Sequence, residues 1–328
     1  MIPDPQGTAR GMAPLTGQEP FFIVWNQGSG RNDAELVRST IQKVLDEAGR
    51  TYELIAVDDG AKLPDIARRA VEAARARGGV VVACGGDGTL NAVARAVLGS
   101  GVPFGILPQG TFNYFGRAYG IPQDTEIATR GLIGAHLEPV QVGLLNGQAF
   151  LVNASLGLYP QLLEDREAYK QRYGRSRLVA LWSAIVTLLR GGHRRLALHL
   201  DSGEVQGVIR TPTLVVGNNA LQLRQIGIPQ AEELERGKLM AMTAKPVGSL
   251  ALYGLLLRGL LSRLGEAENV ISFPFESMTV RLGKRRRRGI KVAMDGEICW
   301  MQAPLEFRVS PEPLMMLVPA EEHRVEVA

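Results

Sequence analysis

The sequence predicts an α/β fold in which an N-terminal domain with a parallel sheet is followed by a mostly β domain. Between Phe21 and Leu107, short apolar runs alternate with segments of helical periodicity, which is typical of a parallel sheet covered by helices on both faces. After His136 the apolar runs become regularly spaced and are separated by turn residues, which favours a second domain built mainly from strands.

The N-terminal domain is predicted over residues 21–136, after a Pro- and Gly-rich leader at 1–20 that we expect to be disordered. Its strands are expected at the apolar runs Phe21–Trp25, Tyr52–Val57, Val80–Cys84 and Pro103–Leu107. Its helices are expected from a capping pattern at Asn32 and Glu35 to Gly49, over Leu63–Arg77 and over Leu90–Leu98.

The second domain is predicted over residues 137–310. Its strands are expected at Val140–Leu144, Ala149–Asn153, Leu196–Leu200, Val205–Ile209, Leu214–Val216, Lys238–Thr243, Met278–Leu282, Ile290–Met294 and Leu305–Val309. Two helical segments interrupt them, around Arg177–Leu189 and Gly248–Leu264. A last apolar run, Leu314–Val318, is a candidate to return to the first domain.

Composition excludes several classes of protein. Of 328 residues, 45% are hydrophobic and 21% are charged, which is typical of a globular chain and not of a disordered one. The formal net charge of +4 suits anionic partners. Two cysteines, Cys84 and Cys299, and four histidines form no metal-ligand pattern, so a zinc site or disulfide framework is excluded and a reducing cytoplasm is indicated. Neither apolar stretch, 178–189 or 247–264, is long and uncharged enough for a transmembrane helix.

The strongest local pattern is a predicted strand that runs into Gly85-Gly86-Asp87-Gly88-Thr89 and then into a helix. Glycines at such a turn let phosphate oxygens approach the backbone, and the helix start offers free N–H groups. Asp87 would repel phosphate unless it engages magnesium or an acceptor hydroxyl. The alternative interpretation is a Gly-rich turn with an aspartate helix cap. P-loop, dinucleotide-binding and protein-kinase motifs are absent from the sequence.

Two further loops follow predicted strands, Asn26–Gly30 and Gly110–Asn113. Because ligands of parallel sheets collect at the carboxyl ends of the strands, we expect these loops to lie beside Gly85–Thr89.

The three loops resemble, in order and spacing, the motifs of the diacylglycerol kinase catalytic domain family, which includes bacterial lipid kinases, sphingosine kinases and ceramide kinases. The matching patterns are Asn26-x-x-Ser29-Gly30, Gly85–Thr89 and Leu107-Pro108-x-Gly110-Thr111-x-Asn113. A late Asp295-Gly296-Glu297 matches the family's Asp-Gly-Glu, although alone it is typical of a hairpin turn. The resemblance extends from Phe21 to Pro319.

The resemblance implies an α/β nucleotide-binding domain and a C-terminal β-sandwich, with ATP in the cleft between them. The implied ATP contacts are Asn26, Ser29, Gly30, Gly85, Gly86, Asp87, Gly88, Thr89, Asn91, Gly110, Thr111 and Asn113. The implied catalytic carboxylates are Asp87, Asp295 and Glu297, and the resemblance leaves open which one accepts a proton. Mg²⁺ is expected with ATP, held by the nucleotide and a carboxylate. The implied reaction is phosphoryl transfer to an alcohol group of diacylglycerol or a related glycerolipid or sphingolipid.

Three positions depart from the family pattern, where Tyr114, Gln141 and Arg236 stand in place of usual acids. Arg236 would repel a cation, so we expect the structural magnesium site of some bacterial members to be missing and predict no metal site of the protein's own. These departures leave the lipid class open.

A lipid substrate implies contact with a membrane surface. Arg175–Arg195 and the basic run Lys284–Arg288 are candidate peripheral contacts at the inner face of the cytoplasmic membrane, although a core-facing helix and a solvated hairpin turn explain them equally well. Nucleic-acid binding is not expected, and a homodimer is left open. Two other functions are open: an NAD-kinase-like hydroxyl kinase, which shares Gly-Gly-Asp-Gly-Thr, and a non-catalytic nucleotide or lipid binder.

Overall fold

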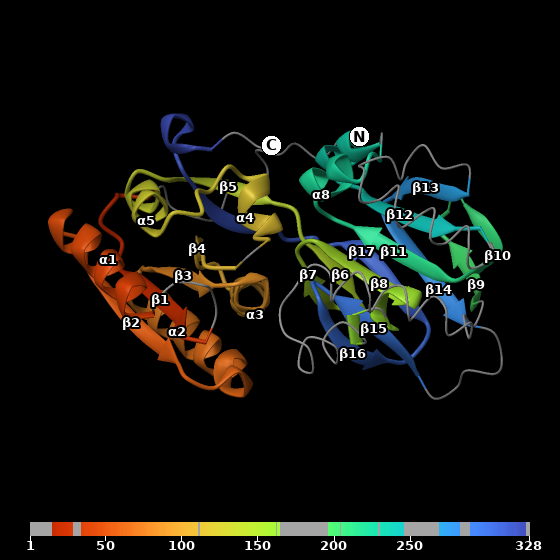
Figure 1. The fold of residues 1–328 in the computed structure, drawn as a ribbon, viewed down its shortest axis with the longest axis horizontal. Helices are drawn as coiled ribbons and strands as arrows, with labels where there is room; N and C mark the ends of the chain where they lie inside the picture. The colour runs from red at the N-terminus through yellow and green to blue at the C-terminus, as the bar shows by residue number, and fades with distance from the viewer. Residues whose placement is uncertain are drawn as a thin grey trace. The chain divides into compact units, whose positions relative to one another are not determined.

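The computed structural model describes residues 15–28, 34–110, 112–161, 163–164, 196–203, 205–228, 230–245, 269–282 and 289–325. The chain divides into two compact units (Figure 1). The first comprises Met1–Val142 together with Ser310–Ala328, and the second comprises Gly143–Val309. The first boundary lies after Val142 and not at residue 136, because the strand His136–Val140 pairs within the first unit.

A six-stranded sheet forms the centre of the first unit, in the order β2-β1-β3-β4-β18-β5. Its strands are β1 Phe21–Asn26, β2 Tyr52–Val57, β3 Val80–Gly85, β4 Phe104–Pro108, β5 His136–Val140 and β18 Leu314–Val318. All neighbouring pairs are parallel except β18 with β5. The last strand of the chain therefore lies between β4 and β5 (Figure 1).

Helices cover both faces of this sheet. They are α1 Ala34–Glu47, α2 Leu63–Arg77, α3 Asp87–Val97, α4 Tyr114–Ala118 and α5 Thr125–Ile133, with short 3₁₀ turns at Gly60–Lys62 and Glu321–His323. Alternate residues of β1, such as Ile23 and Trp25, pack with Ile41 of α1 and Leu132 of α5. The helices α2 and α3 pack against each other and against β3, so the alternation predicted from the sequence is confirmed.

The second unit is a β-sandwich of two antiparallel sheets, β10-β9-β14-β17-β6-β7 and β13-β12-β11-β8-β15-β16. The strands are β6 Gly143–Leu145, β7 Gln148–Phe150, β8 Asn153–Gly157, β9 Leu196–Asp201, β10 Gln206–Thr211, β11 Thr213–Gly217, β12 Leu239–Ala244, β13 Val270–Phe275, β14 Ser277–Leu282, β15 Ile290–Met294, β16 Glu297–Met301 and β17 Leu305–Val309. Both sheets contribute to one core, with Phe150 and Phe307 from the first and Leu156 and Val292 from the second. The predicted fold class is confirmed.

A smaller apolar cluster lies on the outer face of the second sheet. There α8, Ala220–Gln225, and the 3₁₀ segment Ala231–Arg236 pack Leu223 and Leu234 against Met240 of β12.

Several strand predictions are wrong in detail. The run Val140–Leu144 is not one strand, because the chain passes from the first unit to the second between Val140 and Gly143. The strand Val270–Phe275 was not predicted, since it contains Pro274, and it lies at a sheet edge where proline is tolerated. The helices expected at 177–189 and 248–264 lie outside the described residues. Within the described ranges, no helix combines the length and hydropathy needed to cross a membrane.

Candidate active site

Three loops follow the carboxyl ends of adjacent parallel strands in the first unit. Trp25 of β1 pairs with Cys84 of β3, and Gly85 of β3 pairs with Pro108 of β4. The segments that begin at Asn26, Gly85 and Gln109 therefore start at one edge of the sheet, as the parallel order predicts.

The first loop is tied to the second by the Asn26 amide. Its Nδ2 donates to the Oγ1 of Thr89 at 2.9 Å, and its Oδ1 accepts from the backbone N of Gly28 at 3.1 Å. Thr89 is buried in the first turns of α3. The predicted ATP contact of Asn26 stays a prediction, whereas its role in fixing the loop is visible in the structure.

The second and third loops touch through glycines. The backbone N of Gln109 donates to the Gly85 carbonyl at 2.8 Å. A Cβ on Gly110 would lie 3.0 Å from the Cα of Gly86 and 2.6 Å from the Oδ1 of Asn113. The two backbones can approach so closely only because these positions lack side chains.

The third loop is shaped by Asn113, whose side chain is 1% exposed. Its Oδ1 accepts from the backbone N of Gly110 at 3.0 Å, and its Nδ2 donates to the Gly110 carbonyl at 2.7 Å. Its φ of 46° is a left-handed conformation that asparagine tolerates better than most residues. The Asn113 backbone N–H donates to the Asp87 carboxylate, so the third loop contacts the acid of the second.

Asp87 is the first residue of α3, and Gly86 is the N-cap, so the aspartate is not the helix cap that the alternative interpretation required. Its Oδ1 is buried and has no hydrogen-bond partner among the described residues. Burial raises the pKa of Asp87, and the hydrogen bond from Asn113 offsets part of this shift. One carboxylate oxygen is thus available to a cation or to a hydroxyl donor.

Asn91 lies one helical turn after Asp87, and residues four apart share a helix face. Its side chain is 1% exposed, and neither its Oδ1 nor its Nδ2 has a partner in the described part of the chain. Buried amides are nearly always hydrogen-bonded, so a polar group of a ligand or a water is the expected partner. Gly88 lies in the same first turn of α3. Ser29, Gly30 and Thr111 lie outside the described residues.

Asp295 belongs to the second unit, where Asp295 and Gly296 connect β15 to β16 with φ values of 48° and 88°. Positive φ at both positions is the signature of a two-residue hairpin turn. The carboxylate accepts hydrogen bonds from the backbone N of Leu151, Val152 and Asn153 at 2.7, 2.8 and 2.9 Å. The side chain therefore holds the loop between β7 and β8.

Glu297, the first residue of β16, is exposed, in contrast to Asp295. The sequence analysis did not predict that Asp295 holds residues 151–153. Asn218 holds the same loop, because its Nδ2 donates to the Leu151 carbonyl at 3.1 Å. The Asp-Gly pair indicated the turn, but no local pattern indicated the partners of the carboxylate.

Two of the residues that replace acids of the family pattern, Tyr114 and Arg236, contact other side chains of the protein. Tyr114 stacks on Phe112 with ring centroids 5.8 Å apart. Arg236 and Lys238 bind the carboxylate of Glu233 at 2.5 and 3.0 Å, and the hydrogen bond from Lys238 is the main reason that the pKa of Glu233 is lowered. Within the described ranges, no group of three or more His, Cys, Asp or Glu side chains gathers in a way that could hold a metal ion.

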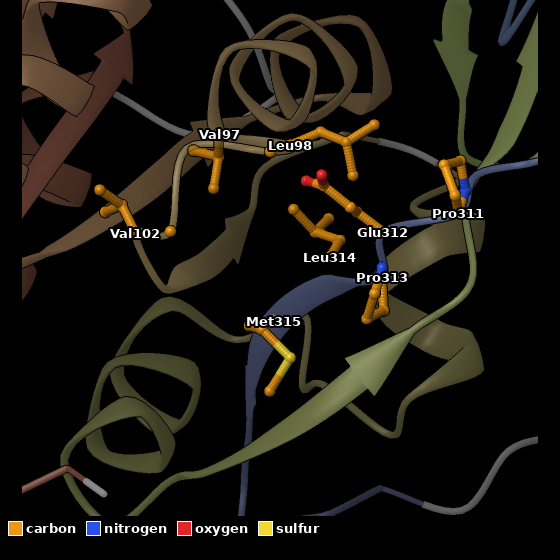
Figure 2. Close-up of a pocket in the computed structure, with 10 residues that line it drawn as sticks. Val97, Leu98, Val102, Pro311, Glu312, Pro313, Leu314 and Met315 are labelled. Atoms are coloured by element: carbon orange, nitrogen blue, oxygen red, sulfur yellow. The ribbon is translucent and has the colours of Figure 1, made fainter. Parts of the chain in front are cut away.

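A pocket of about 280 Å³ lies elsewhere in the first unit (Figure 2). It is lined by the chain before β4 and by the chain that enters β18, including Val102 and Leu314, with the Glu312 carboxylate among them. Because β4 and β18 are parallel and both begin there, the pocket lies at the sheet edge opposite to the three loops.

The fold of this chain, an α/β unit and an antiparallel β-sandwich, is similar to that of solved diacylglycerol kinases. A crystal structure of a diacylglycerol kinase from Bacillus anthracis superimposes with a TM-score of 0.67 over 93% of this chain and 98% of that chain, at 17% identity. Residues 20–145 match the family model of the diacylglycerol kinase catalytic domain, which confirms the predicted resemblance.

The chain is also similar in sequence to several bacterial proteins. An uncharacterized protein from Synechocystis sp. is 26% identical over 93% of this chain and 71% of its own length. The diacylglycerol kinase of Bacillus subtilis is 32% identical over 44% of this chain. The match spans 47% of that relative's length, less than two thirds of it.

Proposed function

We propose that the chain is an ATP-dependent lipid kinase that phosphorylates a hydroxyl of diacylglycerol, or of a related glycerolipid or sphingolipid. The proposal rests on one observation: the Oδ1 of Asp87 is buried and has no hydrogen-bond partner among the described residues. Burying such an atom costs free energy unless it is used. Its position, at the start of α3 and hydrogen-bonded to the third loop, is suited to phosphate chemistry.

In the proposed reaction the lipid hydroxyl attacks the γ-phosphorus of ATP, the bond to ADP breaks, and the hydroxyl proton passes to a carboxylate. The loop Gly85–Thr89 supplies backbone N–H groups and the positive end of the α3 dipole to the phosphates. Magnesium, when bound, would offset the charge of the triphosphate. Among the described side chains, Asp87 is the one we propose to bind this cation or to accept the proton of the acceptor hydroxyl.

The carboxylates of the second unit have different roles in this proposal. Asp295 fixes the loop 151–153 through three hydrogen bonds, and the exposed Glu297 is the group that meets the phosphates or the magnesium. The predicted contacts of Ser29, Gly30 and Thr111 with ATP complete the nucleotide site. We place the enzyme in the cytoplasm, acting on lipid at the inner membrane face.

The test is transfer of label from γ-labelled ATP with Mg²⁺ to micellar diacylglycerol, monoacylglycerol, ceramide and sphingosine, with NAD in a parallel reaction. Asp87→Asn is expected to lose about 100-fold or more of the transfer, which corresponds to about 2.7 kcal/mol of transition-state stabilisation. The matched control is Asp65→Asn, which removes an exposed acid from the first turn of α2 and should leave transfer unchanged.

Each other outcome contradicts the proposal in its own way. Label in NAD alone would assign the chain to the NAD-kinase-like alternative. ATP binding without label in any acceptor would favour a non-catalytic binder. Equal transfer by the Asp87→Asn and Asp65→Asn variants would show that the acid of the second loop is only a helix-start residue.

A further inference from the structure

The β15–β16 hairpin carries the most exposed large hydrophobic side chain of the described residues, Trp300, which is 67% exposed. Tryptophan is usually largely buried in folded proteins, so an indole on the surface requires an explanation. Trp300 lies on β16, which forms one edge of its sheet. No further strand of that sheet covers it within the described part of the chain.

Two neighbours define the surroundings of this indole. Lys291, which pairs with Trp300 across the hairpin, places its Nζ 5.5 Å from the ring centroid. The same ammonium group binds the Glu164 carboxylate at 2.5 Å. A Cβ on Gly289 would lie 3.7 Å from the Cε3 of Trp300, so the indole packs against the chain where it enters β15. We call Trp300, Lys291 and Gly289 the Trp300 patch.

The sequence that immediately precedes Gly289 indicates the kind of partner. In the sequence, five consecutive basic residues, Lys284–Arg288, immediately precede Gly289. A basic run attracts the anionic headgroups of a bilayer, and a tryptophan prefers the boundary between headgroups and acyl chains. A second copy of this chain would carry the same basic run next to the same hairpin in sequence, and like charges repel.

We infer that the Trp300 patch is a membrane anchor, at which Trp300 inserts into the headgroup region of a bilayer rich in anionic lipids. The proposed function enters only in the choice of a lipid surface, because membrane binding requires no phosphoryl transfer. A lone indole gives weak anchoring, and a second, electrostatic signal makes the binding stable.

The test is sedimentation of the full chain, without ATP, with vesicles of pure phosphatidylcholine or of phosphatidylcholine with phosphatidylglycerol. We expect binding to the anionic vesicles only, and weaker binding at high salt. Trp300→Ala should weaken it by about tenfold, the effect of withdrawing one large apolar side chain from the interface. The control Val208→Ala, at a residue 57% exposed on the edge strand β10 of the other sheet, should leave binding unchanged.

A second readout is quenching of tryptophan fluorescence by lipids brominated on their acyl chains. The quenched component should disappear in Trp300→Phe, which identifies the inserted indole. Absence of vesicle binding, equal binding by Trp300→Ala and the parent chain, or binding of single-stranded RNA in preference to vesicles would each overturn the inference. Because none of these measurements uses turnover, they are independent of whether the chain proves to be a kinase.

Discussion

Replacing Asn91 by leucine should make the protein more stable and less active. The Asn91 side chain is 1% exposed, and neither of its polar atoms has a hydrogen-bond partner among the described residues. Leucine has a similar shape and removes both atoms. An unsatisfied buried polar group costs about 1–3 kcal/mol, so we expect the free energy of unfolding to rise by about that amount. For a unit of this size the melting temperature should rise by about 2–10 °C.

The same substitution should lower lipid phosphorylation by about 10- to 100-fold. Asn91 shares a helix face with Asp87, so its amide is placed to hold a phosphate, the cation or a water beside that carboxylate. A hydrogen bond to a charged group is worth about 1.5–3 kcal/mol, which gives the expected range of rates.

The assays are calorimetry without ligand and the labelled-ATP transfer reaction, with Thr129→Val as the matched control. Thr129 is fully buried in α5, and its Oγ1 donates to the Thr125 carbonyl at 2.6 Å, so its hydroxyl is satisfied. The control should lower stability slightly and leave transfer unchanged. If Asn91→Leu lowers the melting temperature as much as Thr129→Val does, the Asn91 amide has a protein partner and the reasoning is refuted. Increased stability with unchanged transfer would refute its functional half.

Three further predictions concern the loops and the two units. Gly110→Ala should lower the free energy of unfolding by about 1–3 kcal/mol in a denaturant titration, because its Cβ would lie 2.6 Å from the Asn113 Oδ1, whereas Gly134→Ala meets no atom within 4 Å and should be neutral. Asp295→Asn should cost about 1.5–3 kcal/mol, since an amide cannot accept all three backbone N–H bonds, and the exposed Glu297→Gln should leave stability unchanged while lowering transfer. Folding raises the pKa of Asp87 above its ordinary value of 3.8, so the folded state holds the carboxyl proton to higher pH than the unfolded state does. The free energy of unfolding of the parent chain therefore falls as the pH rises above 3.8. Asp87→Asn should therefore gain stability relative to the parent at pH 7 and lose this advantage below about pH 4 in calorimetry across that range; a pH-independent difference would contradict the assignment.

The sequence predicted β1 to β4 and β18 of the first unit because each is a short apolar run bounded by turn or helix signals, whereas β5, His136–Val140, is not such a run and was not predicted. Val80–Gly85 and Leu314–Val318 needed no tertiary information to be recognised as strands. The pairing partners of the latter could only be proposed, since β18 reaches its neighbours from the far end of the chain. Val270–Phe275 was not predicted, and its proline disfavours a strand in the middle of a sheet. The strand forms because it lies at a sheet edge, where the missing N–H of proline is tolerated.

The candidate site was predicted in its position but not in its connections. The hydrogen bond from Asn26 to Thr89 joins residues 63 apart, and those that the backbone N–H groups of Leu151–Asn153 donate to Asp295 span 142 to 144 positions. Such bonds leave no periodicity or local pattern in a sequence. Trp300 was overlooked for a related reason, because a strand residue's exposure depends on which strands cover it and not on its neighbours in the chain.

These connections change how the motif residues are best understood. Asn26, Asn113 and Asp295 all use their side chains within the protein, and each is satisfied by backbone or hydroxyl groups of a neighbouring segment. Asp87 and Asn91 instead bury polar atoms that no described residue satisfies. Buried side chains whose polar atoms are hydrogen-bonded within the protein stabilise the fold. Buried polar atoms that no described residue satisfies reduce stability unless a ligand or water binds them. The chemistry proposed here therefore belongs first to the pair on α3, and the asparagines of the flanking loops keep that pair in place.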